Sequence, residues 1–216
     1  MIRTQEIDWS LYLVTDPRLS ERRSLLNMVE AAVKGGAGIV QYRDKESGTR
    51  KMVETAKSLC HVCHRLGACF LVNDRVDVAL AVGADGVHVG QDDMPIDIAR
   101  MLLGSGKLIG ITVHNAEEIR QAEKEGADYL SLAPVYATST KSDHQTPLGP
   151  EGVKRLAAMS HIPVLAIGGI NHSNAAEVVR SGVQGICVVS AILSAEDPLS
   201  AARELYNLVK AAKNRE

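Results

Sequence analysis

The sequence lacks an excess of charge of either sign. Its 216 residues include 24 Lys and Arg against 26 Asp and Glu, which gives a formal net charge of -2 at pH 7. Proteins that bind nucleic acids or anionic membranes use a basic surface, so we expect neither partner here. A chain of this length fits one α/β domain, residues 1–216, that buries roughly 70% of its unfolded surface.

Long apolar runs are also missing. No segment approaches the roughly 18 consecutive apolar residues that span a membrane. Residues 1–8 contain acidic side chains and no apolar core, unlike a signal peptide. We therefore expect a cytoplasmic protein.

Cysteine is scarce, and the few thiols are expected to be reduced rather than to form a disulfide framework. Three of the four lie close together, at Cys60, Cys63 and Cys69. The segment Cys60-His61-Val62-Cys63-His64 matches the string that attaches c-type haem. Its cysteines also continue an apolar stripe of helical spacing from Met52, so we interpret the segment as one face of a packed helix.

One unit repeats along the chain. Eight short apolar segments predict strands, at residues 11–14, 38–41, 69–72, 86–89, 108–111, 129–132, 163–167 and 185–189. Amphipathic stretches of helical spacing lie between them. Five of the predicted strands follow a glycine that can take the left-handed conformation that ends a helix, at Gly36, Gly67, Gly83, Gly126 and Gly182.

Eight strands alternating with helices predict an α/β fold of the (β/α)8 TIM-barrel type. The alternative is a doubly wound open sheet, but no Gly-x-Gly-x-x-Gly motif follows the first strand to support a dinucleotide site. In a TIM barrel the functional residues lie at the carboxyl ends of the strands. The residues that follow each predicted strand are therefore the candidates for a functional site.

Carboxylates follow two consecutive strands, Asp74 after the third and Asp93 after the fourth. Neighbouring parallel strands lie about 4.8 Å apart, so both side chains can reach one cation. Each aspartate alone is more typical of a helix N-cap, but together they predict a Mg²⁺ site, and Mg²⁺ suggests a substrate phosphate. We assign no chemistry to Asp77 or Asp92, and we interpret His88 as a histidine that lines the barrel.

The second predicted strand leads into Gln41-Tyr42-Arg43-Asp44-Lys45. Strand alternation places Gln41, Arg43 and Lys45 on one side, at the mouth of the barrel. A solvated loop with ordinary charges is the alternative.

The fifth predicted strand leads into Thr112 and His114. The hydroxyl of Thr112 suits a hydrogen bond to a ligand or to the local backbone. His114 suits an acid or base, and helix capping near Asn115 explains it equally well.

Two further segments have the features of phosphate sites. Residues 134–149 form the longest aperiodic stretch, and Thr138, Ser139, Thr140 and Lys141 within it suit a lid over a phosphate. The seventh and eighth strands lead into Gly168-Gly169-Ile170 and Val189-Ser190-Ala191, where glycine backbone and a helix N-terminus predict a phosphate site. The alternative there is a tight turn without a ligand.

These segments together predict two anion sites of different strength. One combines a metal with the cations Arg43, Lys45 and Lys141, and the other has backbone and hydroxyl donors only. A diphosphate with about three negative charges needs the first, because each desolvated and unpaired charge costs several kcal/mol. Diphosphate is a good leaving group once neutralised, so the predicted reaction transfers an organic group.

The motifs match a known family. The chain resembles thiamine-phosphate synthases over nearly its whole length, in Tyr12-Leu13-Val14-Thr15-Asp16, Gln41-Tyr42-Arg43-Asp44-Lys45, Asn73-Asp74, Gly86-Val87-His88-Val89-Gly90-Gln91-Asp92-Asp93, Thr138-Ser139-Thr140-Lys141, Gly168-Gly169-Ile170 and Val189-Ser190. The resemblance implies a TIM-barrel transferase that joins 4-amino-5-hydroxymethyl-2-methylpyrimidine diphosphate to 4-methyl-5-(2-phosphoethyl)thiazole or its carboxylate. The products would be thiamine phosphate and diphosphate.

The resemblance also implies residue roles, with Mg²⁺ as the cofactor at Asp74 and Asp93. The pyrimidine diphosphate would contact Gln41, Tyr42, Arg43, Asp44, Lys45, Asn73, Thr112 and Lys141. The thiazole phosphate would contact Thr138, Ser139, Thr140, Gly169, Val189 and Ser190. We assign catalysis of a dissociative reaction to Arg43, Lys45, Thr112 and Lys141, with no protein nucleophile, so Cys187 is left as a packing residue.

Three residues depart from the family pattern: Thr112, Ala133 and Ala137 stand where serine, glycine and proline are usual. None removes a charge or a metal ligand. The alternatives are a thiazole tautomerase of the same fold and a non-catalytic binder of thiamine phosphates. The expected partners are the two small-molecule substrates, with self-association into a homo-oligomer left open.

Overall fold

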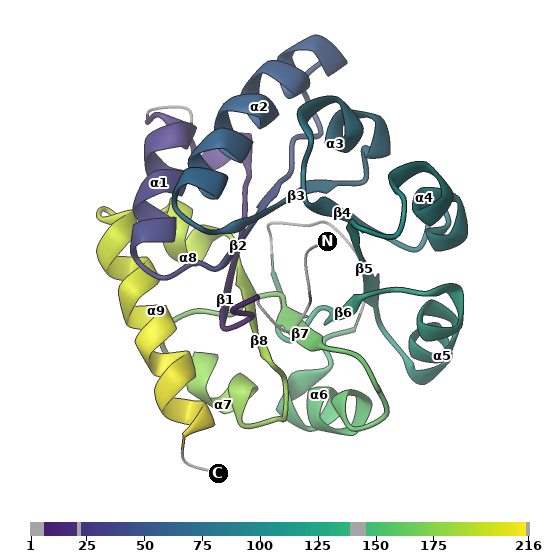
Figure 1. Cartoon of the computed structure of the whole chain (residues 1–216). Coiled ribbons are helices and arrows are strands. Elements are labelled where there is room, and N and C mark those ends of the chain that lie inside the picture. Colours follow the sequence, from purple (N-terminus) through teal and green to yellow (C-terminus); the bar gives the residue numbers. More distant parts are fainter. Residues whose placement is uncertain (1–6, 21–22, 139–145, 215–216) are drawn as a thin grey trace.

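Eight parallel strands form a closed barrel in the computed structural model, which describes residues 7–20, 23–138 and 146–214 (Figure 1). The strands are β1 (Leu11–Val14), β2 (Ile39–Tyr42), β3 (Cys69–Asn73), β4 (Gly86–Val89), β5 (Leu108–Val113), β6 (Tyr129–Leu132), β7 (Val164–Ile167) and β8 (Gly185–Val188). Each pairs with its neighbours in sequence order, and β1 closes the barrel against β8 with Tyr12 opposite Cys187. The predicted (β/α)8 TIM barrel is confirmed.

Helices surround the barrel. They are the short 3-10 helix η2 (Pro17–Leu19) and the α-helices α1 (Leu25–Lys34), α2 (Thr49–Arg65), α3 (Val76–Val82), α4 (Ile96–Leu103), α5 (Ala116–Glu125), α6 (Gly149–Ala157), α7 (Ala175–Val179), α8 (Ser190–Leu193) and α9 (Pro198–Lys213). The C-terminal α9 packs beside α1 and α7 (Figure 1). This contact closes the outer layer as the β1–β8 pairing closes the inner one.

The predicted strand positions agree with the structure within one or two residues. The main difference is β5, which continues to Val113 because its second half stays buried against its neighbours. Thr112 therefore lies inside a strand and not beyond it. The five glycines expected to end helices all have positive φ angles, between 69° and 117°, as predicted.

The apolar side chains form two layers. The larger lies between the strands and the helices. The smaller fills the barrel and includes Trp9, Tyr12, Leu71, Tyr129 and Leu165. The rings of Trp9 and Tyr129 have centroids 5.1 Å apart and are tilted by 48°, so tilted aromatic rings pack inside the barrel.

The cysteine-containing segment is helical, as interpreted. Cys60 and Cys63 lie in α2 and are buried against the barrel. The Nε2 atom of His64 lies 2.9 Å from Oδ2 of Asp85 and is therefore engaged in the fold. All four cysteines are free in the structure.

A recurring side-chain contact fixes the turns that lead into the strands. Asp85, just before β4, accepts a hydrogen bond of 2.8 Å from the backbone N–H of Phe70 in β3. Asp128, just before β6, accepts one of 2.7 Å from Ile109 in β5. The same position before β8 is Gln184, which accepts the N–H of Val164 at 2.6 Å. Each contact ties the turn before one strand to the start of the preceding strand, and so helps to set the register of the barrel.

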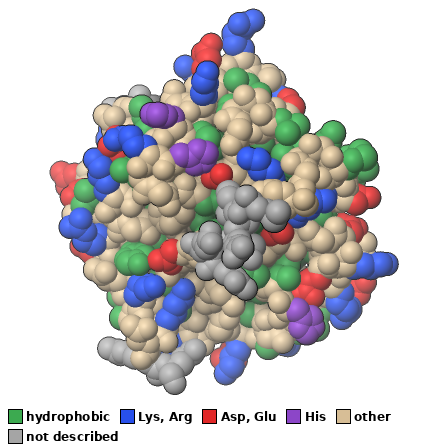
Figure 2. Space-filling view, viewed as in Figure 1, with side chains coloured by type: hydrophobic (Ala, Val, Ile, Leu, Met, Phe, Trp, Pro, Cys, Tyr) green, Lys and Arg blue, Asp and Glu red, His purple; other side chains and the backbone are tan. Residues whose placement is uncertain are grey.

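The surface mixes charges of both signs. Figure 2 shows Lys and Arg side chains interspersed with Asp and Glu on the face in view, as expected from the near-neutral net charge. Among the residues that the structure describes, no helix has both the length and the apolar character needed to cross a bilayer.

We predict that Asp85→Ala lowers the free energy of unfolding by about 1–3 kcal/mol, because it leaves the buried N–H of Phe70 without its acceptor. Asp85→Asn keeps an acceptor oxygen and is the matched control, with a smaller expected loss. Urea denaturation followed by circular dichroism measures both. Equal losses in the two variants would contradict this role of the Asp85 oxygen.

Candidate active site

A cavity of about 560 Å³ opens among the loops that follow the strands. Its lining comes from every strand of the barrel or the loop after it, in accord with the usual site of a TIM barrel. Predicted site residues that line it are Gln41, Arg43, Lys45, Asn73, Asp74, Asp93, Thr112, Thr138, Gly169, Val189 and Ser190. The structure therefore brings most of the predicted site together.

Side chains at the end of β2 and just after it point alternately into the cavity and away from it, as predicted. Gln41, Arg43 and Lys45 line the cavity. Arg43 is held through its backbone, because the Thr15 hydroxyl accepts its N–H at 2.9 Å and donates to its carbonyl at 3.1 Å. The loop after β1 thus fixes the cation at the mouth of the barrel.

Tyr42 and Asp44 do not line the cavity. Tyr42 is buried in the outer apolar layer, and its hydroxyl donates to Asp44 at 3.0 Å. Asp44 also accepts the backbone N–H groups of Glu46 and Ser47, both at 2.9 Å. The structure therefore places these two predicted substrate contacts in the support of the β2–α2 loop.

The predicted metal ligands lie together at the ends of β3 and β4. Asp74 accepts hydrogen bonds from Lys45 and from the side chain of Asn73. Asp93 accepts the backbone N–H of Gly90 at 2.8 Å, which turns its carboxylate back toward the strand end. Burial raises the pKa of the Asp74 carboxyl, the Lys45 hydrogen bond acts in the opposite direction, and the hydrogen bond and negative charge of Asp93 raise it further. The two carboxyl groups therefore face each other.

The turn that carries Asp74 is unusual. Its φ angle is 57°, the left-handed region that few residues other than glycine adopt. Its backbone N–H donates to the carbonyl of His88 in β4 at 2.8 Å. Within residues 7–20, 23–138 and 146–214, no group of three or more His, Cys, Asp or Glu side chains is placed to hold a metal ion. Any cation here would be held by two carboxylates and not by a complete protein cage.

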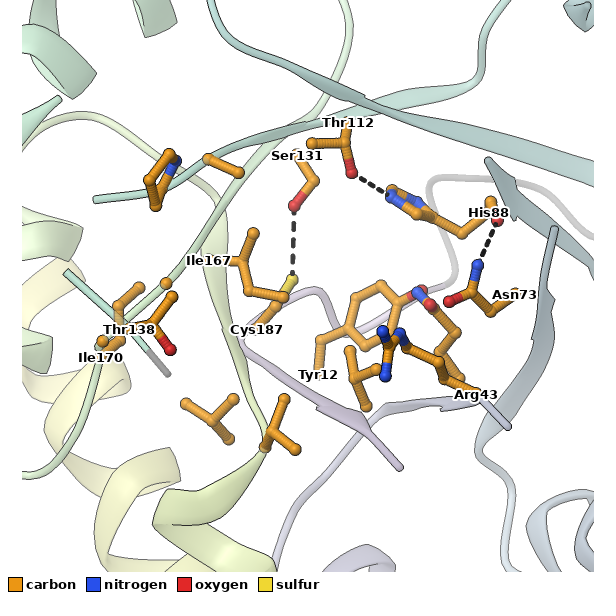
Figure 3. A pocket seen from close by; sticks show the side chains of 18 of the residues that line it. Tyr12, Arg43, Asn73, His88, Thr112, Ser131, Thr138, Ile167, Ile170 and Cys187 are labelled. Carbon is orange, nitrogen blue, oxygen red and sulfur yellow. Dashed lines mark hydrogen bonds between the residues drawn. The ribbon is translucent and has the colours of Figure 1, made fainter. Parts of the chain in front are cut away.

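His88 lines the cavity, as interpreted from its place in the strand. Its Nε2 lies 2.9 Å from the Thr112 hydroxyl. The side-chain amide of Gln91 donates to the Thr112 carbonyl at 2.6 Å, which steadies the end of β5. Figure 3 shows Thr112 and His88 side by side at the cavity wall, with Asn73 next to His88.

His114 and Asn115 both contact Glu118 at the start of α5. Asn115 is the N-cap of α5, because its Oδ1 accepts the N–H groups of Glu117 and Glu118, both at 3.0 Å. His114 lines the cavity, and its Nδ1 lies 2.9 Å from a carboxylate oxygen of Glu118. The helix-cap alternative therefore applies to His114 as well, because its backbone N–H donates to Glu118 in the first turn of α5 at 2.8 Å.

The opposite side of the cavity is built from glycine backbone and hydroxyl groups. Thr138 and Ile170 lie across the cavity from Asn73 and His88 (Figure 3). The short helix α8 starts at Ser190 beside them. Arg23 donates to the carbonyls of Leu193 at 2.6 Å and Ala195 at 2.7 Å, and so holds the other end of α8 in place.

The packing of the barrel requires glycine at positions 168 and 169, for a reason that the sequence does not reveal. Their φ angles are 109° and 65°. A Cβ atom at Gly168 would lie 2.8 Å from the Pro134 side chain, and one at Gly169 would lie 2.8 Å from the Ala137 carbonyl. The β6–α6 loop therefore crosses directly over these glycines, and a larger residue at Gly169 would displace that loop before it met any ligand.

Several residues of the cavity were not predicted. The most notable are Tyr12, Thr15, Ser131, Asn171 and Ser194. Alternation in β1 and a polar residue within the sixth apolar segment are the signals that point to Tyr12 and Ser131. Conversely, the predicted contacts Ser139, Thr140 and Lys141 lie outside the described residues.

Comparison with known proteins identifies the family. The family model described as thiamine monophosphate synthase matches residues 11–192. The chain belongs to that family. A thiamine-phosphate synthase of Chloroflexus aurantiacus is 51% identical over 209 residues, which are 97% of this chain and 96% of the relative. The Moorella thermoacetica thiamine-phosphate synthase is 43% identical and covers 96% of this chain and 99% of its own.

A solved structure agrees with this assignment. The thiamine phosphate pyrophosphorylase from Pyrococcus furiosus has a TM-score of 0.88 at 42% sequence identity, covering 97% of this chain and 99% of its own. The predicted family and enzyme class are thereby confirmed. The chain is a transferase of the thiamine-phosphate synthase family.

Within this family site, Cys187 is expected to be unreactive. Its side chain lines the cavity, and burial raises the pKa of the thiol to about 12. Since only the thiolate is a nucleophile, we predict slow alkylation of Cys187 by iodoacetamide in the folded protein at neutral pH and rapid alkylation after unfolding in urea. Mass spectrometry of the labelled peptide measures both rates. Rapid labelling in the folded state would show that the thiol is activated.

Proposed function

We propose that this protein joins 4-amino-5-hydroxymethyl-2-methylpyrimidine diphosphate to 4-methyl-5-(2-phosphoethyl)thiazole, or to its carboxylate, and releases thiamine phosphate and diphosphate. One observation carries the proposal. A single cavity has two facing carboxylates with two cations on one side, and glycine loops with hydroxyl groups on the other. That asymmetry matches one substrate with a diphosphate and another with a monophosphate.

The diphosphate belongs on the side of Asp74 and Asp93. Arg43 and Lys45 supply positive charge there, and Lys141, outside the described residues, is the third cation in the proposal. The side chain of Lys45 is 55% exposed and that of Asp74 only 14%. Lys45 can therefore exchange its contact with Asp74 for one with a phosphate oxygen, whereas Asp74 stays in place.

The two carboxylates fit Mg²⁺. This ion is usually held by one or two carboxylates, substrate phosphates and water, because it gives up its hydration reluctantly. Two facing carboxylates, one with a raised pKa, form a negative site that a divalent cation would stabilise. Bound there, Mg²⁺ would neutralise negative charge on the diphosphate.

The monophosphate belongs on the side of Gly169, Val189 and Ser190. Positive φ at Gly169 and the start of α8 present backbone groups to the cavity, and backbone N–H groups at such places bind phosphate. Thr138 adds a side-chain hydroxyl at the cavity wall. Ser139 and Thr140, which lie outside the described residues, complete this set in the proposal.

The proposed reaction is dissociative. The bond between the pyrimidine methylene carbon and the diphosphate oxygen breaks, and its electron pair leaves with the diphosphate. Arg43 and Lys45 stabilise the charge that develops on the leaving group. The lone pair of the thiazole nitrogen then forms the new carbon–nitrogen bond to the cationic methylene group. No protein nucleophile is needed, in keeping with the raised pKa of Cys187.

Gln41, Asn73 and Thr112 complete the proposed pyrimidine side. All three line the cavity near the carboxylate pair. Their role is to orient the ring so that the departing oxygen faces the cations. The thiazole tautomerase alternative handles no diphosphate and would leave Asp74, Asp93, Arg43 and Lys45 without a function.

The first test is a two-substrate assay. We predict that thiamine phosphate and diphosphate form in equal amounts only when both substrates and Mg²⁺ are present, and that EDTA stops the reaction until excess Mg²⁺ is added back. A phosphate-release assay coupled through a pyrophosphatase measures the diphosphate, and chromatography measures the thiamine phosphate. A non-catalytic binder would give neither product, and a tautomerase would release no diphosphate.

The second test removes charge without volume. We predict that Asp74→Asn and Asp93→Asn each lower kcat/KM by roughly 100- to 1,000-fold, while Asp92→Asn, an exposed neighbour, leaves it unchanged. Asparagine tolerates the left-handed conformation at residue 74, so the fold is retained. Steady-state kinetics with a Mg²⁺ titration provides the measurement. Unchanged rates in both variants would refute the assignment of the diphosphate side.

A further inference from the structure

A chain of hydrogen bonds crosses the inside of the barrel at the floor of the cavity, and Tyr12 and His88 also line the cavity. Gln41 Nε2 donates to the Tyr12 hydroxyl at 2.7 Å, and that hydroxyl lies 2.9 Å from the Tyr129 hydroxyl. The Tyr129 hydroxyl lies 2.9 Å from Nδ1 of His88, and Nε2 of His88 lies 2.9 Å from the Thr112 hydroxyl. The chain therefore links β2, β1, β6, β4 and β5, and it starts and ends at residues that line the cavity.

The two tyrosines in the middle are fully enclosed. Tyr129 is 0% exposed and Tyr12 is 1% exposed, and they pack among Trp9, Leu71 and Leu165. Burying a hydroxyl group in apolar surroundings is costly unless it is hydrogen-bonded. Phenylalanine would supply the same packing without that cost, so these hydroxyl groups point to a role other than filling space.

The barrel also makes room for Tyr129. Gly110 in β5 lies directly opposite Tyr129 in the strand register. A Cβ atom at Gly110 would lie 2.0 Å from Cζ of the Tyr129 ring and 2.5 Å from its hydroxyl oxygen. The neighbouring strand is therefore reduced to glycine where the tyrosine ring crosses it.

The hydrogen bonds have one self-consistent direction in which every link from Gln41 to Thr112 is satisfied, with Gln41 as the first donor. Each tyrosine hydroxyl has a single hydrogen. Because Gln41 donates to Tyr12, the hydrogen of Tyr12 goes to Tyr129, and that of Tyr129 goes to Nδ1 of His88. In this direction Nδ1 of His88 accepts from Tyr129, and Nε2 carries the hydrogen that is donated to Thr112. The hydroxyl hydrogen of Thr112 and the carbonyl oxygen of Gln41 are left for the cavity.

We propose that Tyr12 and Tyr129 are positioning residues, whose hydroxyl groups make Gln41 a hydrogen-bond acceptor and Thr112 a hydrogen-bond donor toward an aminopyrimidine. This inference rests on the proposed function. An aminopyrimidine carries an amino group that donates and ring nitrogens that accept, so it needs one group of each kind. For Gln41 to donate and Thr112 to accept instead, all five side chains of the chain would have to exchange their donor and acceptor roles together. The tyrosine hydroxyl groups therefore couple the hydrogen-bonding role of Gln41 to that of Thr112.

Removing single hydroxyl groups tests the proposal. In Tyr129→Phe and Tyr12→Phe, the KM for the pyrimidine diphosphate should rise about tenfold, while the KM for the thiazole phosphate stays within twofold of wild type. Tyr206→Phe is the control, because its hydroxyl contacts Asp8 at 2.9 Å outside the barrel. A purely structural role would lower stability and affect both substrates equally, and that outcome would overturn the proposal.

A spectroscopic measurement on the substrate-free protein adds an independent test. The ¹⁵N shifts of the His88 ring, assigned by comparison with His88→Gln, should show hydrogen on Nε2 in wild type. Tyr129→Phe should shift the ring toward the other tautomer, because Nδ1 loses its donor. Tyr12→Phe should shift the tautomer less than Tyr129→Phe does, because the contact between Tyr129 and His88 remains but its direction is no longer fixed from Gln41.

The outcomes separate the two proposals. If the wild-type protein forms no thiamine phosphate, the proposed function and the aminopyrimidine assignment fail together, whatever the tautomer. If it forms thiamine phosphate but Tyr129→Phe changes neither the His88 tautomer nor the KM for the pyrimidine diphosphate, the inference alone fails. Should either single variant not fold, the double variant Tyr12→Phe/Tyr129→Phe, which removes both buried hydroxyl groups, must show the same selective rise in KM or the inference is rejected.

Discussion

The whole site depends on the pairing of β1 with β8. Leu11, Tyr12 and Leu13 lie opposite Ile186, Cys187 and Val188, so the two ends of the barrel sequence become neighbours. Because all strands are parallel, closure brings every strand's carboxyl end to one rim. Side chains separated by more than 100 residues then meet across one cavity, and the tyrosine pair inside the barrel exists only because β1 has been brought within reach of β6.

The rim concentrates like charges at a place where the backbone is already strained. Asp74 adopts a left-handed conformation, which costs on the order of 1–3 kcal/mol for a residue other than glycine. Its carboxyl also faces that of Asp93. Lys45, Asn73 and the backbone of His88 offset these costs in the substrate-free protein. A ligand that brings a divalent cation would relieve the repulsion between the two carboxyl groups. The relief of that repulsion would contribute to the free energy of binding.

Periodicity and glycine positions predicted the strands, the helix ends and the fold, because both signals are local. The same local alternation predicted that Gln41, Arg43 and Lys45 line the cavity, as they do. Alternation also turns Tyr42 and Asp44 away from the cavity, although the family resemblance implied that both contact the substrate. The crossing of the β6–α6 loop over Gly168 and Gly169 could not be predicted, because it depends on contacts between distant segments. The hydrogen-bond chain through Tyr12 and Tyr129 could not be predicted for a similar reason. Both tyrosines resemble ordinary apolar strand residues in the sequence, and only the strand register places their hydroxyl groups 2.9 Å apart.

His88 connects the two halves of the pyrimidine side. Its backbone carbonyl accepts the N–H of Asp74 and so supports the turn that carries a carboxylate. Its ring lies between Tyr129 and Thr112 and so belongs to the hydrogen-bond chain that we propose orients an aminopyrimidine. One residue of β4 therefore links the carboxylate pair at the rim to the hydrogen-bond chain inside the barrel. The contact between the His88 carbonyl and Asp74 does not depend on the His88 side chain, whereas the contacts of the ring with Tyr129 and Thr112 do. A substitution of His88 can therefore change the hydrogen-bond chain inside the barrel without removing the backbone contact that supports Asp74.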